Sequence, residues 1–181
     1  MINGGRAVFL DRDGTVVENV PYCCRPEDLR ILPAAARAIT LLNQEGFYVV
    51  IVTNQSGLAR GYFDWPMLSK IHSKMTHELA GLGARVDAIY VCPHMPDATC
   101  ACRKPRPGLV IRASTDLSID LSRSYLVGDS LTDILAGKRS GCKTILIRTG
   151  TERVFSVPSD AAMPDYCAKD LYEATLWIVR R

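Results

Sequence analysis

The stretch AVFLDRDGT, from Ala7 to Thr15, joins four apolar residues directly to a polar cluster that contains Asp11 and Asp13. The apolar residues do not alternate with polar ones, which is typical of a parallel strand that is covered on both faces. In open parallel sheets, ligands bind beyond the carboxyl ends of the strands. The stretch therefore predicts a buried central strand whose end carries part of a polar site.

The same strand-like pattern recurs four times along the chain, with helical patterns in between. The further strands are expected at Tyr48–Val52, Ala88–Val91, Ser124–Val127 and Lys143–Ile147. Helices are expected at Pro33–Glu45, around Leu68, Ile71, Met75 and Leu79, and at Gly108–Asp116, Leu131–Ser140 and Leu171–Val179. This alternation predicts βαβ units with right-handed crossovers. We expect one α/β domain over residues 1–181, a Rossmannoid three-layer sandwich with a mainly parallel central sheet.

Length and composition fit such a domain and argue against several other classes. The 181 residues are 48% hydrophobic, enough for a full core without disulfides. Charged residues make up 23% and the net charge is only +3, so no basic stripe indicates nucleic acid or an anionic membrane. No apolar run is long enough for a signal peptide or a membrane span. We expect a cytoplasmic monomer with a small-molecule substrate.

Polar residues follow the other expected strands as well. Thr53, Asn54 and Gln55 follow the second strand, Arg103 and Lys104 come after the third, and Asp129 and Ser130 follow the fourth. Each feature alone has an ordinary explanation: a DxD sequence is often a turn, and a Gly-Asp pair before a helix is often an N-cap. Because they occur in order at successive strand ends, we expect them to converge on one site.

The residue types at this site indicate phosphate chemistry. Asp11, Asp13 and Asp129 offer oxygen ligands without histidine or cysteine, a set that favours Mg²⁺. One aspartate could attack phosphorus, and the other could protonate the leaving oxygen and then activate water. Lys104 supplies a point charge for a phosphoryl group, and the planar guanidinium of Arg103 suits a second anionic group.

A separate cluster of soft ligands lies between the third expected strand and Arg103. Cys92, His94, Cys100 and Cys102 provide four ligands, the number that closes a tetrahedral zinc site without an open catalytic position. In a reducing compartment such a cluster favours metal over disulfides. The alternative is a reduced loop without metal. Of the remaining cysteines, Cys142 and Cys167 are expected to be small apolar core residues.

Four segments resemble the motifs of the haloacid dehalogenase superfamily of phosphatases: FLDRDGTV, VTNQSG, RKPRPG and VGDSLTDI. The resemblance covers nearly the whole chain and implies an Mg²⁺-dependent mechanism through an aspartyl-phosphate. It makes Asp11 the nucleophile and Asp13 the general acid/base, with Thr53 and Lys104 holding the phosphoryl group. It also implies that Asp129 completes the Mg²⁺ site with Asp11 and the backbone carbonyl of Asp13.

Asp133, in the same fourth motif, has two possible roles. It could support the metal site from behind. It could equally be an exposed carboxylate in the first turn of a helix, where the helix dipole favours negative charge.

The cysteine-histidine loop resembles that of the subfamily that contains the heptose 1,7-bisphosphate and histidinol-phosphate phosphatases, in which the zinc is structural. YVCPHMP and the late IRTG, Ile147–Gly150, resemble the heptose branch in particular. The implied activity is removal of the C7 phosphate of D-glycero-D-manno-heptose 1,7-bisphosphate, a lipopolysaccharide core precursor. The alternatives are a histidinol-phosphate phosphatase and a catalytically silent sugar-phosphate-binding module.

The gaps between the motifs are too short for a large cap domain, so we expect an open site. Its specificity should come from the loops Glu18–Arg25 and Gly57–Asp64 and from the zinc loop at residues 92–102. The expected substrate-binding residues are Asn19, Tyr22, Asn54, Gln55, Arg103 and Ser130. Ser130 departs from the heptose branch, which often has lysine at that position.

Overall fold

Six parallel strands form one sheet in the computed structural model, which describes residues 4–149 and 163–181. The strands are β1 (Ala7–Leu10), β2 (Tyr48–Asn54), β3 (Ala88–Cys92), β4 (Tyr125–Gly128), β5 (Lys143–Ile147) and β6 (Tyr166–Ala168), in the order β3-β2-β1-β4-β5-β6. The chain proceeds from β1 toward one edge and later from β4 toward the other edge. The switch point, where such sheets bind ligands, therefore lies between β1 and β4.

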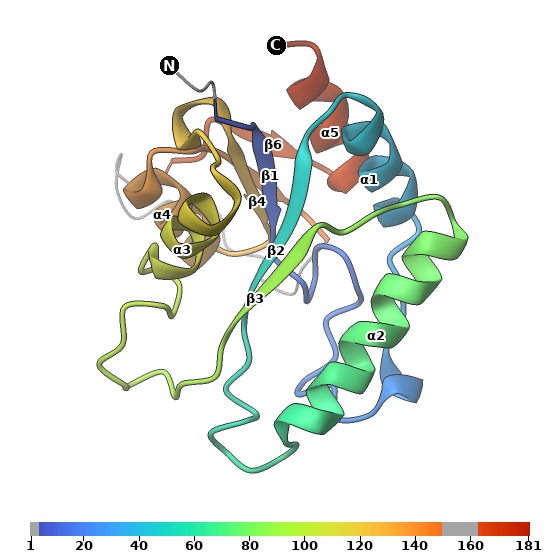
Figure 1. Cartoon of the computed structure of the whole chain (residues 1–181), viewed down its shortest axis with the longest axis vertical. Coiled ribbons are helices and arrows are strands. Elements are labelled where there is room, and N and C mark those ends of the chain that lie inside the picture. The colour runs from blue at the N-terminus through green and yellow to red at the C-terminus, as the bar shows by residue number, and fades with distance from the viewer. Residues whose placement is uncertain (1–3, 150–162) are drawn as a thin grey trace.

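Helices cover both faces of the sheet (Figure 1). One face carries α1 (Ala35–Gln44), α2 (Trp65–Gly81) and α5 (Leu171–Val179), and the other carries α3 (Gly108–Leu117) and α4 (Leu131–Ser140). Two short 3-10 helices, η1 (Pro26–Asp28) and η2 (Leu121–Arg123), lie in connections. The predicted three-layer α/β architecture is confirmed, and within the described residues the sheet is parallel throughout.

The central strand shows why its sequence does not alternate. Val8 and Leu10 belong to the core under α1, α2 and α5, whereas Ala7 and Phe9 belong to the core under α3 and α4. All four side chains are fully buried. Asp11, the next residue, is the first to leave the covered part of the sheet, and its N–H still bonds the carbonyl of Val127 at 3.1 Å.

The predicted elements differ from the structure in detail. α1 begins two residues after Pro33 and stops before Gly46, which has a φ of 76°. β6 was not predicted, because three residues are too few to show an apolar run. Cys167 lies on this edge strand and is exposed, so its expected place in the core is wrong, whereas Cys142 is buried as expected.

The connection from β1 to α1 contains isolated β-bridges and η1, and the described part of the chain contains no separate cap domain. Gly150, at the end of the IRTG segment, lies outside the described residues.

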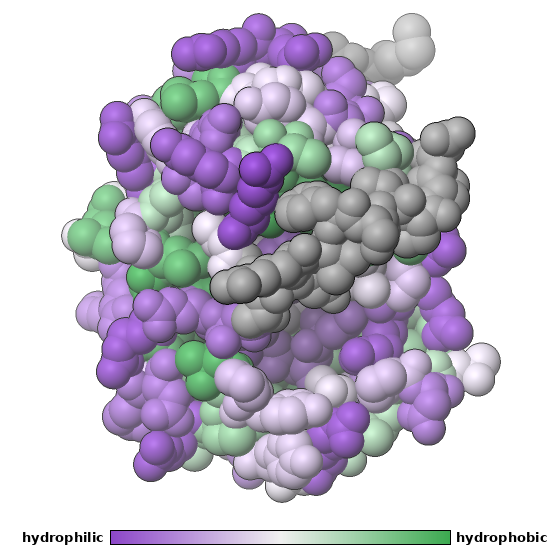
Figure 2. All heavy atoms as spheres, turned by 180° about the vertical axis from the view of Figure 1, so that it is seen from behind, coloured by the Kyte–Doolittle hydropathy of each residue, from purple (hydrophilic) through white to green (hydrophobic). Residues whose placement is uncertain are grey.

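On the face seen from behind, hydrophilic side chains predominate and the hydrophobic ones form small separate groups (Figure 2). None of the described helices has the length and apolar character that crossing a membrane requires.

Candidate active site

A cavity of about 280 Å³ lies at the carboxyl ends of β1, β2 and β4. Its lining includes most of the site residues predicted from the sequence, namely Asp11, Asp13, Asn19, Tyr22, Thr53, Asn54, Gln55, Lys104, Asp129 and Ser130. Residues from distant parts of the chain thus converge because parallel strands deliver their ends to one rim. Arg103 and the four predicted zinc ligands lie outside this lining.

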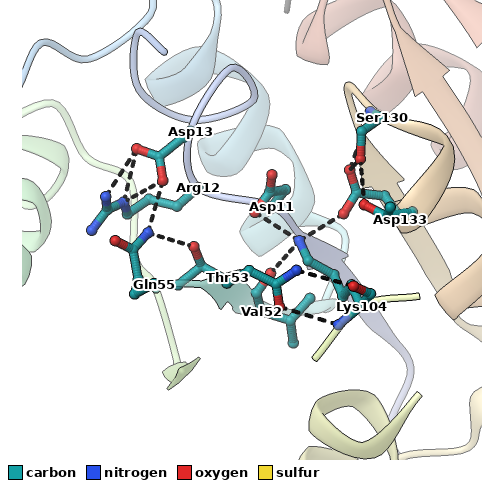
Figure 3. A network of polar contacts seen from close by, with 11 residues as sticks. Asp11, Arg12, Asp13, Val52, Thr53, Gln55, Lys104, Ser130 and Asp133 are labelled. Carbon is teal, nitrogen blue, oxygen red and sulfur yellow. Dashed lines mark hydrogen bonds and ion pairs between the residues drawn. The ribbon is translucent and has the colours of Figure 1, made fainter. Parts of the chain in front are cut away.

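Lys104 is a buried cation in the lining of the cavity, and its ammonium lies among several oxygen atoms (Figure 3). Its Nζ lies 2.7 Å from Asp11 Oδ1 and 2.6 Å from Asp133 Oδ1, and it donates to the carbonyl of Val52 at 2.8 Å. Burial lowers the pKa of Lys104, but the two carboxylates outweigh burial and hold that pKa above its usual value. The ammonium therefore remains charged, and its three N–H groups point to Asp11, Asp133 and the carbonyl of Val52.

Asp11 lies beside this ammonium but is poorly solvated. Burial raises the pKa of its carboxyl to about 7; the charge of Lys104 opposes that rise, and the carboxylates of Asp133 and Asp13 add to it. A nucleophilic carboxylate must be ionised. An additional positive charge next to Asp11 would favour the ionised form.

Three carboxylates form a cluster that can receive such a charge. Oxygen atoms of Asp11, Asp129 and Asp133 all lie within 4.8 Å of one another. The alternative of an exposed Asp133 is wrong, because its side chain is completely buried between Lys104 and Ser130. Ser130 donates to Asp133 Oδ2 from its N–H at 3.2 Å and from its hydroxyl at 2.6 Å, so this predicted substrate-binding hydroxyl is directed to Asp133.

The space around Asp129 is shaped by a glycine. Gly14 has a φ of 78°, and a Cβ at this position would lie 2.1 Å from Asp129 Oδ2. Residue 14 must therefore lack a side chain for the carboxylate of Asp129 to approach the backbone that follows Asp13. An all-oxygen set of buried carboxylates with this close approach fits a hard divalent cation such as Mg²⁺.

Asp13 engages partners other than those of Asp11 (Figure 3). The guanidinium of Arg12 donates from Nη2 to Asp13 Oδ1 at 2.9 Å and from Nε to both carboxylate oxygens at 3.1 Å. Gln55 Nε2 donates to Asp13 Oδ2 at 2.8 Å and to Thr53 Oγ1 at 2.9 Å. Thr53 thereby keeps its hydroxyl proton to donate.

Arg12 is a residue of this network that was not predicted from the sequence. It is only 1% exposed, which is rare for arginine and requires that its donors be satisfied. Its position between two aspartates, at the end of an apolar strand, is the signal that could have identified it.

Asn54 connects β2 to the lysine segment. Its Nδ2 donates to the carbonyl of Lys104 at 3.2 Å, and the N–H of Lys104 donates to Asn54 Oδ1 at 3.1 Å. Both ends of the amide are engaged by the backbone, so in this structure Asn54, although it lines the cavity, positions Lys104.

The four predicted zinc ligands come together in a separate cluster. Cys92 Sγ lies 3.3 Å from Cys102 Sγ and 3.9 Å from Cys100 Sγ, and His94 Nδ1 lies 3.2 Å from Cys102 Sγ. Zinc–sulfur bonds of about 2.3 Å place tetrahedral sulfur ligands about 3.8 Å apart. The separation of Cys92 from Cys100 matches this value, and that of Cys92 from Cys102 is shorter. Burial and the adjacent thiols raise the pKa of Cys102 to about 12, so a bound cation would be needed to hold Cys102 as a thiolate.

Two arginines of the RKPRPG segment support this loop. Arg103 Nη1 donates to the carbonyl of His94 at 3.1 Å, and Arg106 Nη1 donates to the carbonyls of Ala98 at 3.1 Å and Cys100 at 2.5 Å. The predicted second-phosphate contact of Arg103 stays a prediction, because its guanidinium lies on the zinc loop and outside the lining of the cavity.

Comparison with known proteins agrees with the site. A HAD-hydrolase-like family model matches residues 101–174. The D-glycero-beta-D-manno-heptose-1,7-bisphosphate 7-phosphatase of Bordetella bronchiseptica is 44% identical over 149 residues, 82% of this chain and 83% of that protein. The D-glycero-D-manno-heptose-1,7-bisphosphate 7-phosphatase of Thermosynechococcus vestitus is 40% identical over 185 residues, 95% and 94% of the two chains.

A solved structure extends the likeness to three dimensions. The D,D-heptose 1,7-bisphosphate phosphatase from B. bronchiseptica, complexed with magnesium and phosphate, superposes with a TM-score of 0.89 at 39% identity and covers 97% of this chain and 98% of its own. Fold and site together define a phosphate-ester hydrolase of the doubly wound α/β class. The chain belongs to the haloacid dehalogenase-like hydrolases, as a phosphoric monoester hydrolase. The resemblance predicted from the four motifs is confirmed.

Proposed function

We propose that the protein removes the C7 phosphate of D-glycero-D-manno-heptose 1,7-bisphosphate, with Asp11 as the nucleophile. The observation that carries the proposal is the position of the Asp11 carboxylate in the cavity, 2.7 Å from the buried ammonium of Lys104 and within the cluster of Asp129 and Asp133. The names of the similar proteins support the choice of sugar.

In the first step, a carboxylate oxygen of Asp11 attacks phosphorus, and the bond from phosphorus to the C7 oxygen breaks. Asp13 gives its proton to that oxygen, so the sugar leaves as an alcohol and Asp11 carries the phosphoryl group. Lys104 and the hydroxyl of Thr53 hold the equatorial oxygens of the transferring group. Asp11, Asp129 and the backbone carbonyl of Asp13 would hold Mg²⁺, which would supply positive charge beside the transferring phosphoryl group.

In the second step, water attacks the phosphorus of the aspartyl-phosphate. The carboxylate of Asp13 takes a proton from this water, the bond from Asp11 to phosphorus breaks, and inorganic phosphate forms. Asp11 is regenerated as a carboxylate and Asp13 as an acid, which closes the cycle. Asp133 contributes by orienting Lys104, because its carboxylate is paired with the Lys104 ammonium and accepts from the hydroxyl of Ser130.

The substrate assignment is tested by comparing kcat/KM for both anomers of heptose 1,7-bisphosphate with kcat/KM for histidinol phosphate. We expect a heptose bisphosphate to be preferred by at least about 100-fold, which corresponds to roughly 2.7 kcal/mol of transition-state discrimination. A preference for histidinol phosphate would refute the sugar assignment and leave the phosphatase chemistry intact.

The chemistry itself is tested with Asp11→Asn, which keeps the shape of the side chain. We expect turnover of every phosphate ester to disappear while the folded structure persists, because an amide cannot form the phosphoenzyme. Substantial residual turnover, above contamination by wild-type protein, would refute the nucleophile assignment and would also favour a different phosphatase mechanism.

We further propose a structural zinc ion held by Cys92, His94, Cys100 and Cys102, and a monomer that acts on a free sugar phosphate in the cytoplasm. The separations of the ligand atoms support the zinc. Because the ligand Cys102 is two residues before Lys104, a bound zinc would fix the backbone of the segment that holds the phosphate. Elemental analysis of freshly purified reduced protein should find about one zinc per chain. Light scattering should give the monomer mass of 19.9 kDa.

A further inference from the structure

His72 contacts the active-site network from outside the cavity. It lies on α2, a helix whose residues carry none of the predicted catalytic groups, and its Nε2 is 3.1 Å from Nη1 of Arg12. We infer that His72 is a positioning residue for Asp13 and acts through the buried guanidinium of Arg12. The inference rests on the proposed function, in which Asp13 protonates the leaving group.

Arg12 can transmit such an effect because it is held on several sides. Its guanidinium donates to both oxygens of Asp13 through Nε and Nη2, and only 1% of the residue is exposed. Its backbone carbonyl accepts from the N–H groups of Val16 at 2.9 Å and Val17 at 3.0 Å. The backbone end of the side chain is therefore fixed. The orientation of Nε and Nη2 toward the Asp13 carboxylate then depends on the other contacts of the guanidinium.

The contact between His72 and Arg12 has a defined direction. A guanidinium has no acceptor, so Nε2 of His72 must accept, and the imidazole is neutral with its proton on Nδ1. Burial and the adjacent charge of Arg12 lower the pKa of His72 to about 4, which keeps this nitrogen an acceptor at neutral pH. His72 thus satisfies the Nη1 group that points away from Asp13.

Loss of that acceptor would leave a buried N–H group of Arg12 without this partner. A buried donor without a partner is unfavourable, so the guanidinium would rotate toward another acceptor and turn its fork away from Asp13. Gln55 would then be the remaining restraint on the Asp13 carboxylate, whose side chain is 22% exposed to the cavity. The defect should affect the proton transfer to the leaving group more than the attack by Asp11.

Two polar replacements of His72 place their side-chain amide at different distances from Arg12. In His72→Gln the side-chain amide reaches the place of Nε2 and can accept from Arg12, whereas in His72→Asn the amide ends near the place of Nδ1 and cannot. The control is His77→Asn, because His77 is an exposed histidine on the same helix. Thermal melts and circular dichroism of all variants establish that the fold is retained.

The readout is kcat/KM for two substrates, since this constant covers the steps up to departure of the leaving group. Heptose bisphosphate releases an alkoxide that needs the proton of Asp13, and p-nitrophenyl phosphate releases a phenolate that needs little protonation. We expect His72→Asn to lower kcat/KM at least about tenfold for the sugar and less than about threefold for the aryl ester, within the range of general-acid effects. His72→Gln and His77→Asn should stay within about threefold of wild type on both substrates.

Equal losses on the two substrates, or no loss in a folded His72→Asn protein, would overturn the inference. Addition of His72→Asn to Asp13→Asn should cause no further loss on the sugar, because the first residue acts only through the second. An additive loss would also overturn it. A wild-type protein that hydrolyses the aryl ester but not the sugar bisphosphate would overturn the proposed substrate, and any alkyl phosphate that it hydrolyses then replaces the sugar in the test.

Discussion

Replacement of Lys104 by methionine is the sharpest test of the buried charge network. Methionine keeps most of the length and volume of the side chain and removes its charge. The ammonium pairs with two carboxylates, Asp11 at 2.7 Å and Asp133 at 2.6 Å, and all three groups are mostly or fully buried. Removing one partner of a buried ion pair typically costs about 3–5 kcal/mol of unfolding free energy, because an uncompensated charge remains.

The size of this loss should depend on pH. With Lys104 present the pKa of Asp11 is about 7, so this carboxyl is mostly neutral at pH 5 and removal of the ammonium costs least there. At pH 8 the carboxyl is mostly ionised in the wild-type protein, whereas without Lys104 its pKa rises further and it stays neutral. Each pH unit above the wild-type pKa adds about 1.4 kcal/mol to the variant's loss, so we expect the loss to be about 1.4 kcal/mol larger at pH 8 than at pH 5. The sign follows from linkage: a carboxyl whose folded pKa is raised contributes stability at low pH that is lost as pH rises.

The measurement is denaturant unfolding at pH 5 and pH 8, with a chelator present so that no divalent cation replaces the lost charge. Lys70→Met is the matched control, because Lys70 is exposed on α2 and its replacement should change stability by less than about 0.5 kcal/mol at either pH. Equal losses for Lys104→Met at the two pH values would refute the reasoning. We also expect its kcat to fall at least about 100-fold, as a donor to the transferring phosphoryl group is lost.

The other predictions concern the two metal sites and the substrate. Gly14→Ala should weaken Mg²⁺ binding, measured by calorimetry, at least about tenfold, because the new Cβ would lie 2.1 Å from Asp129 Oδ2; unchanged affinity would show that the approach is not required. Mg²⁺ should raise Tm more at pH 8 than at pH 5, since the pKa of Asp11 is about 7 without metal and protons compete with the cation below it; equal shifts would contradict this. Zinc chelation should lower Tm, and an unchanged Tm would argue against a structural ion. Arg103→Ala should reduce kcat/KM for a bisphosphate more than for a monophosphate, whereas equal losses would restrict Arg103 to its contact with the zinc loop.

The elements that the sequence predicted well are those with a local cause. The strands at Ala7–Leu10 and Lys143–Ile147 and the helix at Leu131–Ser140 were predicted with the bounds that the structure has. Apolar runs and a helix-ending glycine are local signals, so they survive without tertiary information. β6 has no such signal, since a three-residue edge strand is defined by its pairing with β5.

For the candidate site too, some features could be predicted from the sequence and others only from the structure. The sequence by itself determined which residues could do chemistry, because carboxylates, lysine and the Cys/His cluster follow strands whose ends must meet in a parallel sheet. Only the tertiary structure decided which of them touch. It buried Asp133 against Lys104, turned Asn54 toward the backbone of Lys104, and placed Arg103 on the zinc loop.

Arg12 and His72 show the physical reason for this division. They are 60 residues apart in the chain, and the 3.1 Å contact between them exists only because α2 packs beside the end of β1. Periodicity and motif spacing carry no information about such a pair, because arginine is usually exposed and histidine is often only partly buried. Packing turns them into a buried donor and its acceptor, and desolvation then makes that contact necessary.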